Sequence, residues 1–542
     1  MIPIIDIFAG PGGLGEGFSS LHGDDGEPIF KIKLSIEKDF FAYQTLKLRS
    51  FFRVFRIGHV PNEYYQFIRG EISLDDLYGA YPDEAEKANR EAWCATLGKP
   101  DEEDTNGVTN EEVDQRIREA LGDETEWILI GGPPCQAYSL AGRARRQEVI
   151  LDESKDKRVG LYKEYLRIIA VHRPAVFIME NVKGILSANT EKENIFGRIL
   201  NDLSNPVAAM VAEGVIEEDN INPVNYTIYS LSVPPRYDAF GNLDINVQDF
   251  IIKSEEYGIP QRRHRVILLG IRNDVVHTEE TLIALDTEIN LQSVINNLPS
   301  IRSGITRFYT HTTINEKTGR KQRHYRKEQD SPERWKDYVL NYNNEINTII
   351  EENLEWTIND LPDSLGEEFI AGNFDLPEEH LLNKWYQDEH IGGIVHHVSR
   401  KHLVQDLKRY LFAAKYTRIK GDFPRMNDYE NAAEDLLPDH ENATSGNFTD
   451  RFRVQRPDIP ATTVTSHISK DGHYFIHYDP KQVRSLTVRE AARIQTFPDN
   501  YYFYGGRTQQ FHQVGNAVPP YLAYQIAGIV YHIVNQNNHE NE

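Results

Sequence analysis

The 542-residue sequence has few of the features that mark secreted or membrane proteins. It contains only two cysteines, Cys94 and Cys135, which lie far apart in unlike surroundings. The sequence therefore argues against a disulfide framework and for a reducing compartment. No apolar run is long enough to span a bilayer, and no basic segment followed by an apolar leader opens the chain. We expect a soluble, cytoplasmic protein.

A positive balance of charge is also lacking, since 83 Asp and Glu outnumber 59 Lys and Arg and the formal net charge is -24 at pH 7. Such a charge counts against a nucleic-acid partner, whose phosphates attract cations. The distribution is uneven, however: residues 101–126 hold eleven acids against two bases and residues 351–379 hold ten acids and no base, whereas residues 302–336 hold ten Lys and Arg against four acids. Aromatic residues interleave with these bases, as on a surface that follows a nucleic-acid backbone. A solvated charged loop would have the same composition.

Strand and helix patterns alternate through the first half of the chain, which exceeds one ordinary domain in length. The run Ile2 to Phe8 predicts a buried strand, followed by a loop that contains Gly10, Gly12 and Gly13. Glycines at such a turn let the backbone approach a ligand closely. No Gly-Lys-Ser/Thr follows, so a nucleoside triphosphate P-loop is not expected. We predict an α/β fold with a doubly wound sheet.

A second strand, Ile32 to Ile36, ends at Glu37. Nucleoside-binding folds place an acid there to hold ribose hydroxyls, although a Glu at this point can also be an exposed helix cap. Gly70-Glu71-Ile72 is a possible third cofactor contact. Residues 79–126 are helical in pattern, strongly acidic and without a motif, and we interpret them as a surface insertion.

A lone cysteine follows the next predicted strand, Trp127 to Ile130. Two glycines and two prolines end that strand abruptly and leave Cys135 on a loop at its carboxyl end, where open α/β sheets place ligands and reactive groups. Free cysteines are often buried structural residues. This one, however, is surrounded by polar and basic residues: Gln136, Tyr138, Ser139, Arg143, Arg145 and Arg146. Because positive surroundings raise the thiolate fraction, Cys135 is a candidate nucleophile.

Two further strands carry charged residues at their ends. Ala175 to Met179 leads to Glu180, a carboxylate that is costly near a reactive thiol unless it has a partner or a task. A helix cap is the simpler interpretation. Gln261, Arg263 and Arg265 precede a later strand, and their close spacing is typical of phosphate or base contacts, or of a solvated basic turn.

The alternation of strands and helices stops at residues 272–480, which are rich in Asn, His, Tyr and charge. It resumes at residues 481–542, where Thr487 and Glu490 form a predicted capping box at the start of a helix. We therefore expect residues 481–542 to complete the catalytic domain of residues 1–271, with a second region inserted between them.

Taken in order, these segments resemble the DNA cytosine-5 methyltransferases. The resemblance rests on stretches in the family's unpermuted order: Asp6-Ile7-Phe8-Ala9-Gly10-Pro11-Gly12-Gly13, Pro133-Pro134-Cys135-Gln136, Glu180-Asn181-Val182, Gln261-Arg262-Arg263-His264-Arg265, Arg489-Glu490-Ala491 and Gln513-Val514-Gly515-Asn516. It implies a Rossmann-like S-adenosylmethionine-dependent methyltransferase domain with an inserted, smaller target-recognition domain at residues 272–480. The family's third motif usually supplies an Asp to the adenine, and Glu71 is our candidate for that place.

The resemblance also implies a role for each site residue. The Cys135 thiolate would add to carbon 6 of a flipped-out cytosine, Glu180 would act as an acid at the ring, and Arg265, supported by Arg263, would hold the carbonyl oxygen of the base and a nearby phosphate. S-adenosylmethionine is expected at Phe8, Gly10, Gly12, Gly13, Glu37, Glu71, Asn516 and Val518. DNA is expected at Gln136, Ser139, Arg143, Arg145 and Gln261. No metal ion is expected.

Other functions stay open at this point. One branch of the family methylates tRNA, but the long basic and aromatic region favours duplex DNA. A non-catalytic DNA-binding relative would not need Cys135, Glu180 and Arg265 together, and a nicotinamide oxidoreductase leaves Cys135 and Glu180 unexplained. The resemblance implies a monomeric, nucleoid-associated prokaryotic enzyme with a cognate restriction endonuclease as genetic partner.

Overall fold

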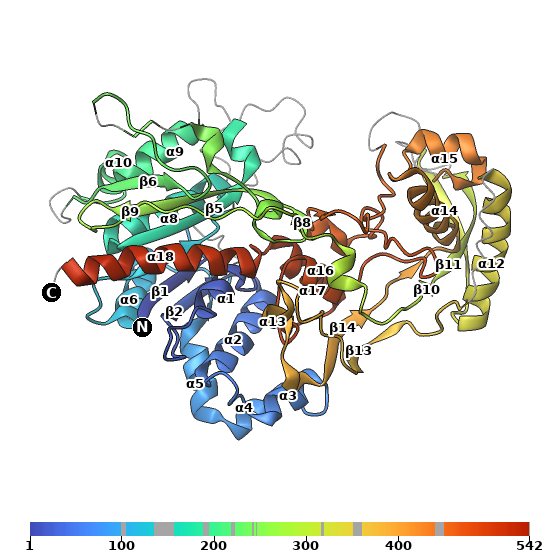
Figure 1. Ribbon diagram of the computed structural model, residues 1–542, viewed down its shortest axis with the longest axis horizontal. Coiled ribbons are helices and arrows are strands. Elements are labelled where there is room, and N and C mark those ends of the chain that lie inside the picture. Colours follow the sequence, from blue (N-terminus) through green and yellow to red (C-terminus); the bar gives the residue numbers. More distant parts are fainter. Residues whose placement is uncertain are drawn as a thin grey trace.

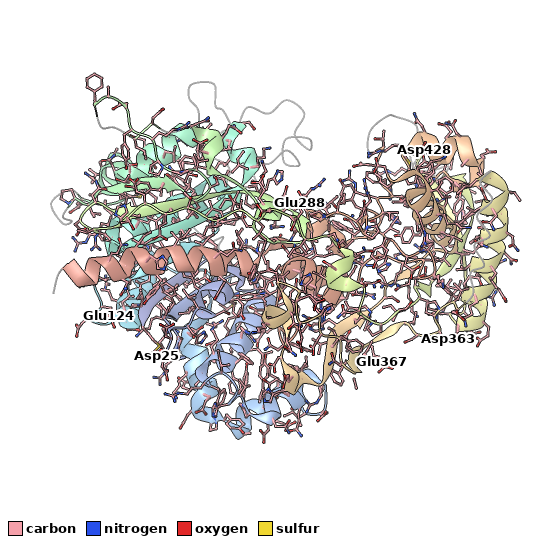
Figure 2. The ribbon with its side chains drawn as sticks, in the orientation of Figure 1. Asp25, Glu124, Glu288, Asp363, Glu367 and Asp428 are labelled. Atoms are coloured by element: carbon pink, nitrogen blue, oxygen red, sulfur yellow. The ribbon has the colours of Figure 1, made fainter. Side chains whose placement is uncertain are left out.

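The computed structural model has a larger and a smaller lobe, and both chain ends lie on the larger one (Figure 1). It describes residues 1–98, 104–134, 157–187, 195–217, 223–240, 243–244, 246–315, 319–350, 360–438 and 449–540. Within these ranges, no helix is long and apolar enough to cross a membrane. Exposed acids over both lobes, among them Asp25, Glu124, Glu288, Asp363 and Glu367, account for much of the negative charge (Figure 2).

The larger lobe is built on a central sheet. Its described strands follow the order β3-β2-β1-β4-β5-β9-β6, and β7 also pairs with β9. Strands β1 to β5 run parallel, whereas β9 lies antiparallel between β5 and β6. The strands are β1 (Ile2–Ile7), β2 (Phe30–Glu37), β3 (Ala92–Cys94), β4 (Ile128–Gly131), β5 (Val176–Val182), β6 (Tyr226–Ser230), β7 (Ile251–Lys253) and β9 (His264–Arg272). The predicted doubly wound α/β fold is confirmed.

Helices cover both faces of this sheet because its strands are apolar on both sides. In β4, Leu129 points to one core cluster, while Ile128 and Ile130 point to the other. The first cluster packs against α6 (Asn110–Leu121), α8 (Lys157–His172), α9 (Ile195–Ser204) and α10 (Pro206–Ala212). The second packs against α1 (Gly13–Ser19) and α18 (Pro520–Glu540). Four helices lie beyond the β3 edge: α2 (Phe40–Val54), α3 (Asn62–Ile68), α4 (Leu74–Ala80) and α5 (Pro82–Glu91).

The acidic stretch 79–126 is part of the fold, so its prediction as a surface insertion was wrong. It contains the edge strand β3 and the helix α6, whose Val113, Ile117 and Leu121 are buried in the first core cluster. A three-residue strand and one apolar helix stripe are hard to recognise among so many acids. The long excursion between the second and third strands consists of α2 to α5 instead.

The smaller lobe comes from the predicted recognition region. Its core surrounds Trp335 and Tyr410, which lie on α12 (Pro332–Ile349) and α14 (Val404–Lys420). The lobe also contains β10 (Gly304–Ile305), β11 (Arg307–Ile314), β12 (Lys321–Lys327), β15 (Lys401–His402) and α15 (Met426–Ala432). Strands β11 and β12 pair as an antiparallel hairpin whose side chains are mostly exposed, and this hairpin carries the basic segment.

A third core joins the two lobes. It is formed mainly by α16 (Val488–Ile494) and α17 (Arg507–Asn516), which return from the smaller lobe and pack between it and the sheet (Figure 1). Contributions come from α11 (Gln292–Ile295), α13 (Asn383–Tyr386), β13 (Gly366–Ala371), β14 (Gly393–Val398) and the short parallel pair of β8 (Gln261–Arg262) with β16 (Ala461–Thr462). The capping box predicted at Thr487 and Glu490 starts α16.

Candidate active site

The glycine loop after β1, Gly10 to Gly13, has a backbone conformation that residues other than glycine rarely adopt. Gly10 and Gly12 have φ values of 59° and 92°, in the left-handed region. A Cβ atom on Gly13 would lie 2.2 Å from the carbonyl oxygen of Val518. Residues 481–542, which we call the return segment, therefore touch the loop directly. A Cβ atom on Gly10, in contrast, would meet no described atom within 4 Å. The loop thus has an open side at Gly10 and a closed side at Gly13.

Glu37 is fixed at the tip of β2 beside this loop. One carboxylate oxygen accepts a hydrogen bond from the Gly10 amide and the other from the Asp39 amide, each at 2.8 Å. Burial raises the pKa of the Glu37 carboxyl, and the two amide hydrogen bonds offset part of that effect. Each oxygen keeps a lone pair, so the carboxylate can accept two ribose hydroxyls.

These features fit the nucleoside cofactor that the resemblance implies. The open side of the loop at Gly10 leaves room for a ligand, and Glu37 offers acceptors next to it. Phe8, at the end of β1, packs against the first core cluster. Asn516 ends α17 with an exposed side chain, and Val518 is buried against Gly13.

Glu71 does not belong to this pocket, so its prediction as the third cofactor acid was wrong. Its half-exposed side chain pairs with Arg69 at 2.6 Å, and Arg69 also donates to the His390 carbonyl. Gly70 lies just after α3, with a left-handed φ of 78°, and is not part of a strand. The third strand is β3, which places Cys94 opposite Glu37. The apolar triplet Ala92–Cys94 was the signal in the sequence for that strand.

Glu180 and Arg265 meet at the carboxyl edge of the sheet. Glu180 lies on β5 and Arg265 on the antiparallel neighbour β9, and Glu180 Oε1 is 2.8 Å from Arg265 Nε. The Nε hydrogen does not point at the carboxylate, so the contact is an ion pair without a hydrogen bond. A Cβ atom on Gly132 would lie 3.1 Å from Glu180 Oε2. The carboxylate therefore faces the loop that leads to Cys135.

Asn181 ties that loop to β5. Its buried side-chain amide donates to the Pro133 carbonyl at 3.2 Å. Pro133 and Pro134 are the last residues described before the loop. Cys135, Gln136, Ser139, Arg143 and Arg145 lie outside the described residues, so their predicted roles stay predictions.

Gln261 is not at a DNA surface, so that prediction was wrong. Its side chain is completely buried; Nε2 donates to the Ile494 carbonyl at 3.1 Å, and Oε1 accepts from the Val464 amide at 3.0 Å. These partners come from α16 and from the segment after β16. Gln261 therefore fixes β8, just before β9, against α16 and the segment after β16.

Arg263 is also buried and does not face a substrate. Its guanidinium donates to the carbonyls of Val464 and Gly515, at 2.8 and 3.3 Å. Burial and the nearby Arg265 lower the pKa of Arg263 well below its ordinary value. Its predicted catalytic role is corrected: Arg263 holds β9, and with it Arg265, against α17.

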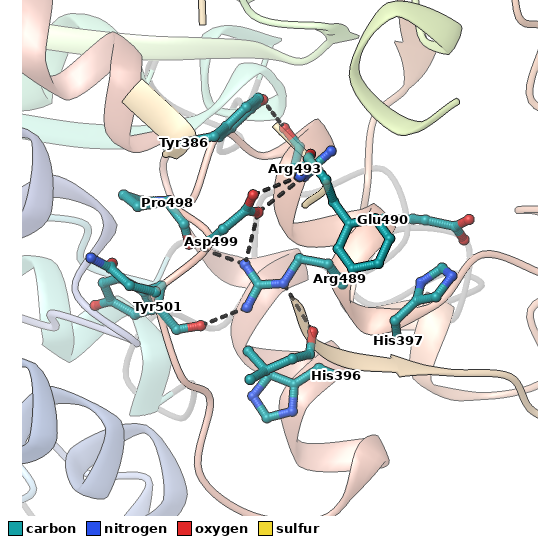
Figure 3. A network of polar contacts seen from close by, with 12 residues as sticks. Tyr386, His396, His397, Arg489, Glu490, Arg493, Pro498, Asp499 and Tyr501 are labelled. Carbon is teal, nitrogen blue, oxygen red and sulfur yellow. Dashed lines mark hydrogen bonds and ion pairs between the residues drawn. The ribbon is translucent and has the colours of Figure 1, made fainter. Parts of the chain in front are cut away.

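Buried arginines of α16, which the sequence did not single out, hold the recognition region to the return segment (Figure 3). Arg493 donates to the carbonyls of Val294 and Phe374, at 3.0 and 2.7 Å, and makes a two-pronged ion pair with Asp499. Arg489 donates to the carbonyls of Val395, Pro498 and Tyr501. The Arg489-Glu490-Ala491 stretch marked this helix, but nothing in its spacing showed which carbonyls its arginines would reach.

Comparisons with known proteins give the relatives of this chain. The model of the family described as C-5 cytosine-specific DNA methylase matches residues 91–206 and 236–532, more than half of the chain. Type II methyltransferase M.Bpa9945I of Bacillus paralicheniformis is 31% identical over 546 residues, covering 98% of this chain and 99% of that protein. DNA (cytosine-5-)-methyltransferase M.ApeKI of Aeropyrum pernix is 26% identical over 417 residues, covering 74% of this chain and 80% of that protein. A solved structure of a putative DNA modification methyltransferase from an E. coli prophage shares 17% identity at a TM-score of 0.46, covering 99% of this chain and 100% of that one.

Proposed function

The chain belongs to the C-5 cytosine-specific DNA methylases, and from that premise we propose that it methylates carbon 5 of a flipped-out cytosine through a covalent adduct with Cys135. It is a DNA (cytosine-5-)-methyltransferase of the restriction-modification type, and its cofactor is S-adenosylmethionine. The covalent step and the residues that perform it are our proposal.

The chemistry requires a nucleophile because carbon 5 of cytosine is itself too electron-poor to accept a methyl group. The Cys135 thiolate adds to carbon 6, which forms a carbon–sulfur bond and places electron density on carbon 5. S-adenosylmethionine supplies the methyl group as an electrophile. Carbon 5 then loses its proton to a base that the sequence does not identify, a role open to water, and the carbon–sulfur bond breaks to release the thiolate.

Glu180 is proposed to stabilise the ring during these steps. Negative charge grows on the ring when the thiolate adds, and an acid near ring nitrogen 3 and the exocyclic amine offsets it. The observation that carries this proposal is the 2.8 Å pair of Glu180 with Arg265 beside Gly132. Arg265 orients the carboxyl group and offers further N–H donors to the carbonyl oxygen of the base.

The cofactor is proposed to lie over the glycine loop. Gly10, Gly12 and Gly13 give the backbone close approach, and Phe8 borders the loop. Glu37 holds the ribose hydroxyls, since its oxygens are fixed by the Gly10 and Asp39 amides. Asn516 and Val518 bound the site from the return segment.

The DNA is proposed to lie between the lobes, with the target nucleotide flipped toward Glu180 because a stacked base hides carbons 5 and 6. The exposed hairpin of β11 and β12 supplies cations for phosphates, and Gln136, Ser139, Arg143 and Arg145 bind the DNA near the target nucleotide. We further propose a monomeric enzyme that protects DNA against a cognate endonuclease.

The test compares the two cysteines. Cys135→Ala should abolish transfer of a radiolabelled methyl group to duplex DNA and leave the S-adenosylmethionine dissociation constant near that of the wild type. Cys94→Ala is the matched control and should keep turnover within about a factor of two, because Cys94 Sγ makes only a long hydrogen bond, 3.8 Å, to the Lys38 carbonyl among the described residues. Full turnover of Cys135→Ala would overturn the covalent mechanism.

A further inference from the structure

Tyr501, in the return segment, contacts the glycine loop after β1, which we call the cofactor loop from here on. It follows α16, its side chain is completely buried, and its hydroxyl donates a hydrogen bond to the carbonyl of Pro11. A Cβ atom on Gly12 would lie 3.0 Å from the Tyr501 hydroxyl oxygen. The phenol therefore supports the cofactor loop at Pro11 and Gly12, between and at its left-handed glycines.

The ring of Tyr501 has little freedom to turn away from the loop. The Arg49 guanidinium lies over it, 5.0 Å from the ring centroid, and Arg49 is itself held by Glu16 of α1 and by Asn500. The ring also packs against Phe497 and Phe503, with centroids 4.7 and 5.3 Å away. Because these neighbours fix the ring, the direction of the hydroxyl is also fixed.

The backbone of Tyr501 is tied to the recognition region. Its carbonyl accepts a hydrogen bond from Arg489 at 2.8 Å, and the same guanidinium donates to Val395 of β14 at 3.1 Å (Figure 3). The neighbouring Asn500 donates to Asp388 at 2.7 Å. The residue that contacts the cofactor loop is thus anchored in the joint between the lobes.

We propose that Tyr501 is a positioning residue for the cofactor loop: through Pro11 it holds the left-handed backbone at Gly10 and Gly12 in the shape that binds S-adenosylmethionine. This inference rests on the proposed cofactor site. Burial raises the pKa of the Tyr501 phenol far above its ordinary value, so the hydroxyl remains a hydrogen-bond donor at every working pH. The cofactor itself need not touch Tyr501.

Replacing Tyr501 by Phe removes the hydroxyl and keeps the ring that packs against Arg49 and the two phenylalanines. The Pro11 carbonyl loses its donor, and the loop gains conformations that do not bind the cofactor. The expected result is a five- to tenfold increase in the dissociation constant, about the effect of one hydrogen bond. Tyr502→Phe is the matched control, because the Tyr502 hydroxyl makes no hydrogen bond to another described residue and its ring contacts Phe67 and His396.

The experiment is isothermal titration of full-length protein with S-adenosylmethionine, without DNA. Tyr501→Phe should bind five- to tenfold more weakly, and Tyr502→Phe within about twofold of the wild type. Steady-state methylation should show the loss in the KM for cofactor, with kcat at saturation within about a factor of two. An unchanged dissociation constant in Tyr501→Phe would overturn the proposal, and so would a loss confined to kcat.

Binding without DNA does not involve Cys135, so this result is independent of the covalent mechanism. If Tyr501→Phe melts well below the wild type, titration at a temperature where both are folded decides the matter. A dissociation constant equal to that of the wild type there counts against the proposal, and a weakened one supports it.

Discussion

Replacing Glu180 by Gln removes the carboxyl group and leaves the rest of the carboxyl edge of the sheet unchanged. The two side chains have nearly the same shape, so the packing beside Gly132 is retained. The variant loses the negative charge 2.8 Å from Arg265 Nε and the ability to donate a proton. It therefore asks whether Glu180 acts chemically or only holds Arg265 in place.

The two possibilities predict effects of different size. Loss of a general acid lowers the rate by about 10²- to 10⁴-fold, equivalent to roughly 3–5 kcal/mol in the barrier. The side chains of Glu180 and Arg265 are 15% and 14% exposed, so their contact is mostly shielded from water. Its loss should cost about 1–3 kcal/mol of folding free energy. In a chain of this length that corresponds to a decrease of a few degrees in the melting temperature.

The assay is single-turnover methyl transfer to duplex DNA at saturating cofactor, with thermal melts on the same samples. Glu255→Gln is the control. Glu255 pairs at 2.7 Å with His264, and His264 immediately precedes Arg265 on β9. We expect at least about a hundredfold loss of rate in Glu180→Gln and near-normal rates in Glu255→Gln. If Glu180→Gln kept more than a tenth of the wild-type rate, another group would have to protonate the ring.

Three further outcomes are expected. Gly13→Ala should weaken S-adenosylmethionine binding at least about tenfold by titration, because its Cβ would lie 2.2 Å from the Val518 carbonyl, whereas Gly79→Ala, in open space on α4, should bind normally. Burial holds the pKa of His397 at about 4, below the unfolded value near 6.5, so the unfolded state binds more protons between these values and the free energy of unfolding falls on acidification. From pH 7.5 to 5.5, His397 should account for about 1.3 kcal/mol of that fall in denaturant titrations, and an equally large fall in His397→Gln would contradict this role of His397. Lys327→Ala, on the exposed hairpin, should reduce the slope of log DNA affinity against log salt concentration by about one, whereas Lys87→Ala on α5 should leave that slope unchanged. Equal slopes for the wild type and both variants would exclude the hairpin from the DNA surface.

The sheet and its carboxyl edge could be predicted because the information is local. Strands β4 and β5 each contain an apolar run buried on both faces, and a distinctive residue follows each run: Gly131 after Ile130 and Glu180 after Met179. Parallel strands bring those ends to one edge of the sheet. The approach of Glu180 to Arg265 follows from β5 and β9 being neighbours.

The roles of Gln261 and Arg263 could not be predicted because they depend on distant partners. A polar run before a strand is equally compatible with solvent, DNA or protein carbonyls. The carbonyls that accept hydrogen bonds from these two side chains belong to residues 464, 494 and 515, more than two hundred positions later in the chain. The prediction for Glu71 failed for a different reason: β3 has only three residues and was not recognised, so the candidate for the third cofactor acid was sought in what is a turn after α3.

The covalent adduct is the centre of this account, and DNA that carries 5-fluorocytosine at the target position tests it most directly. Fluorine cannot leave carbon 5 as a proton does, so the enzyme, its DNA and S-adenosylmethionine should form a complex that survives boiling in detergent. Cys94→Ala should form the complex and Cys135→Ala should not. No stable complex on a DNA whose unmodified form is methylated would contradict the mechanism.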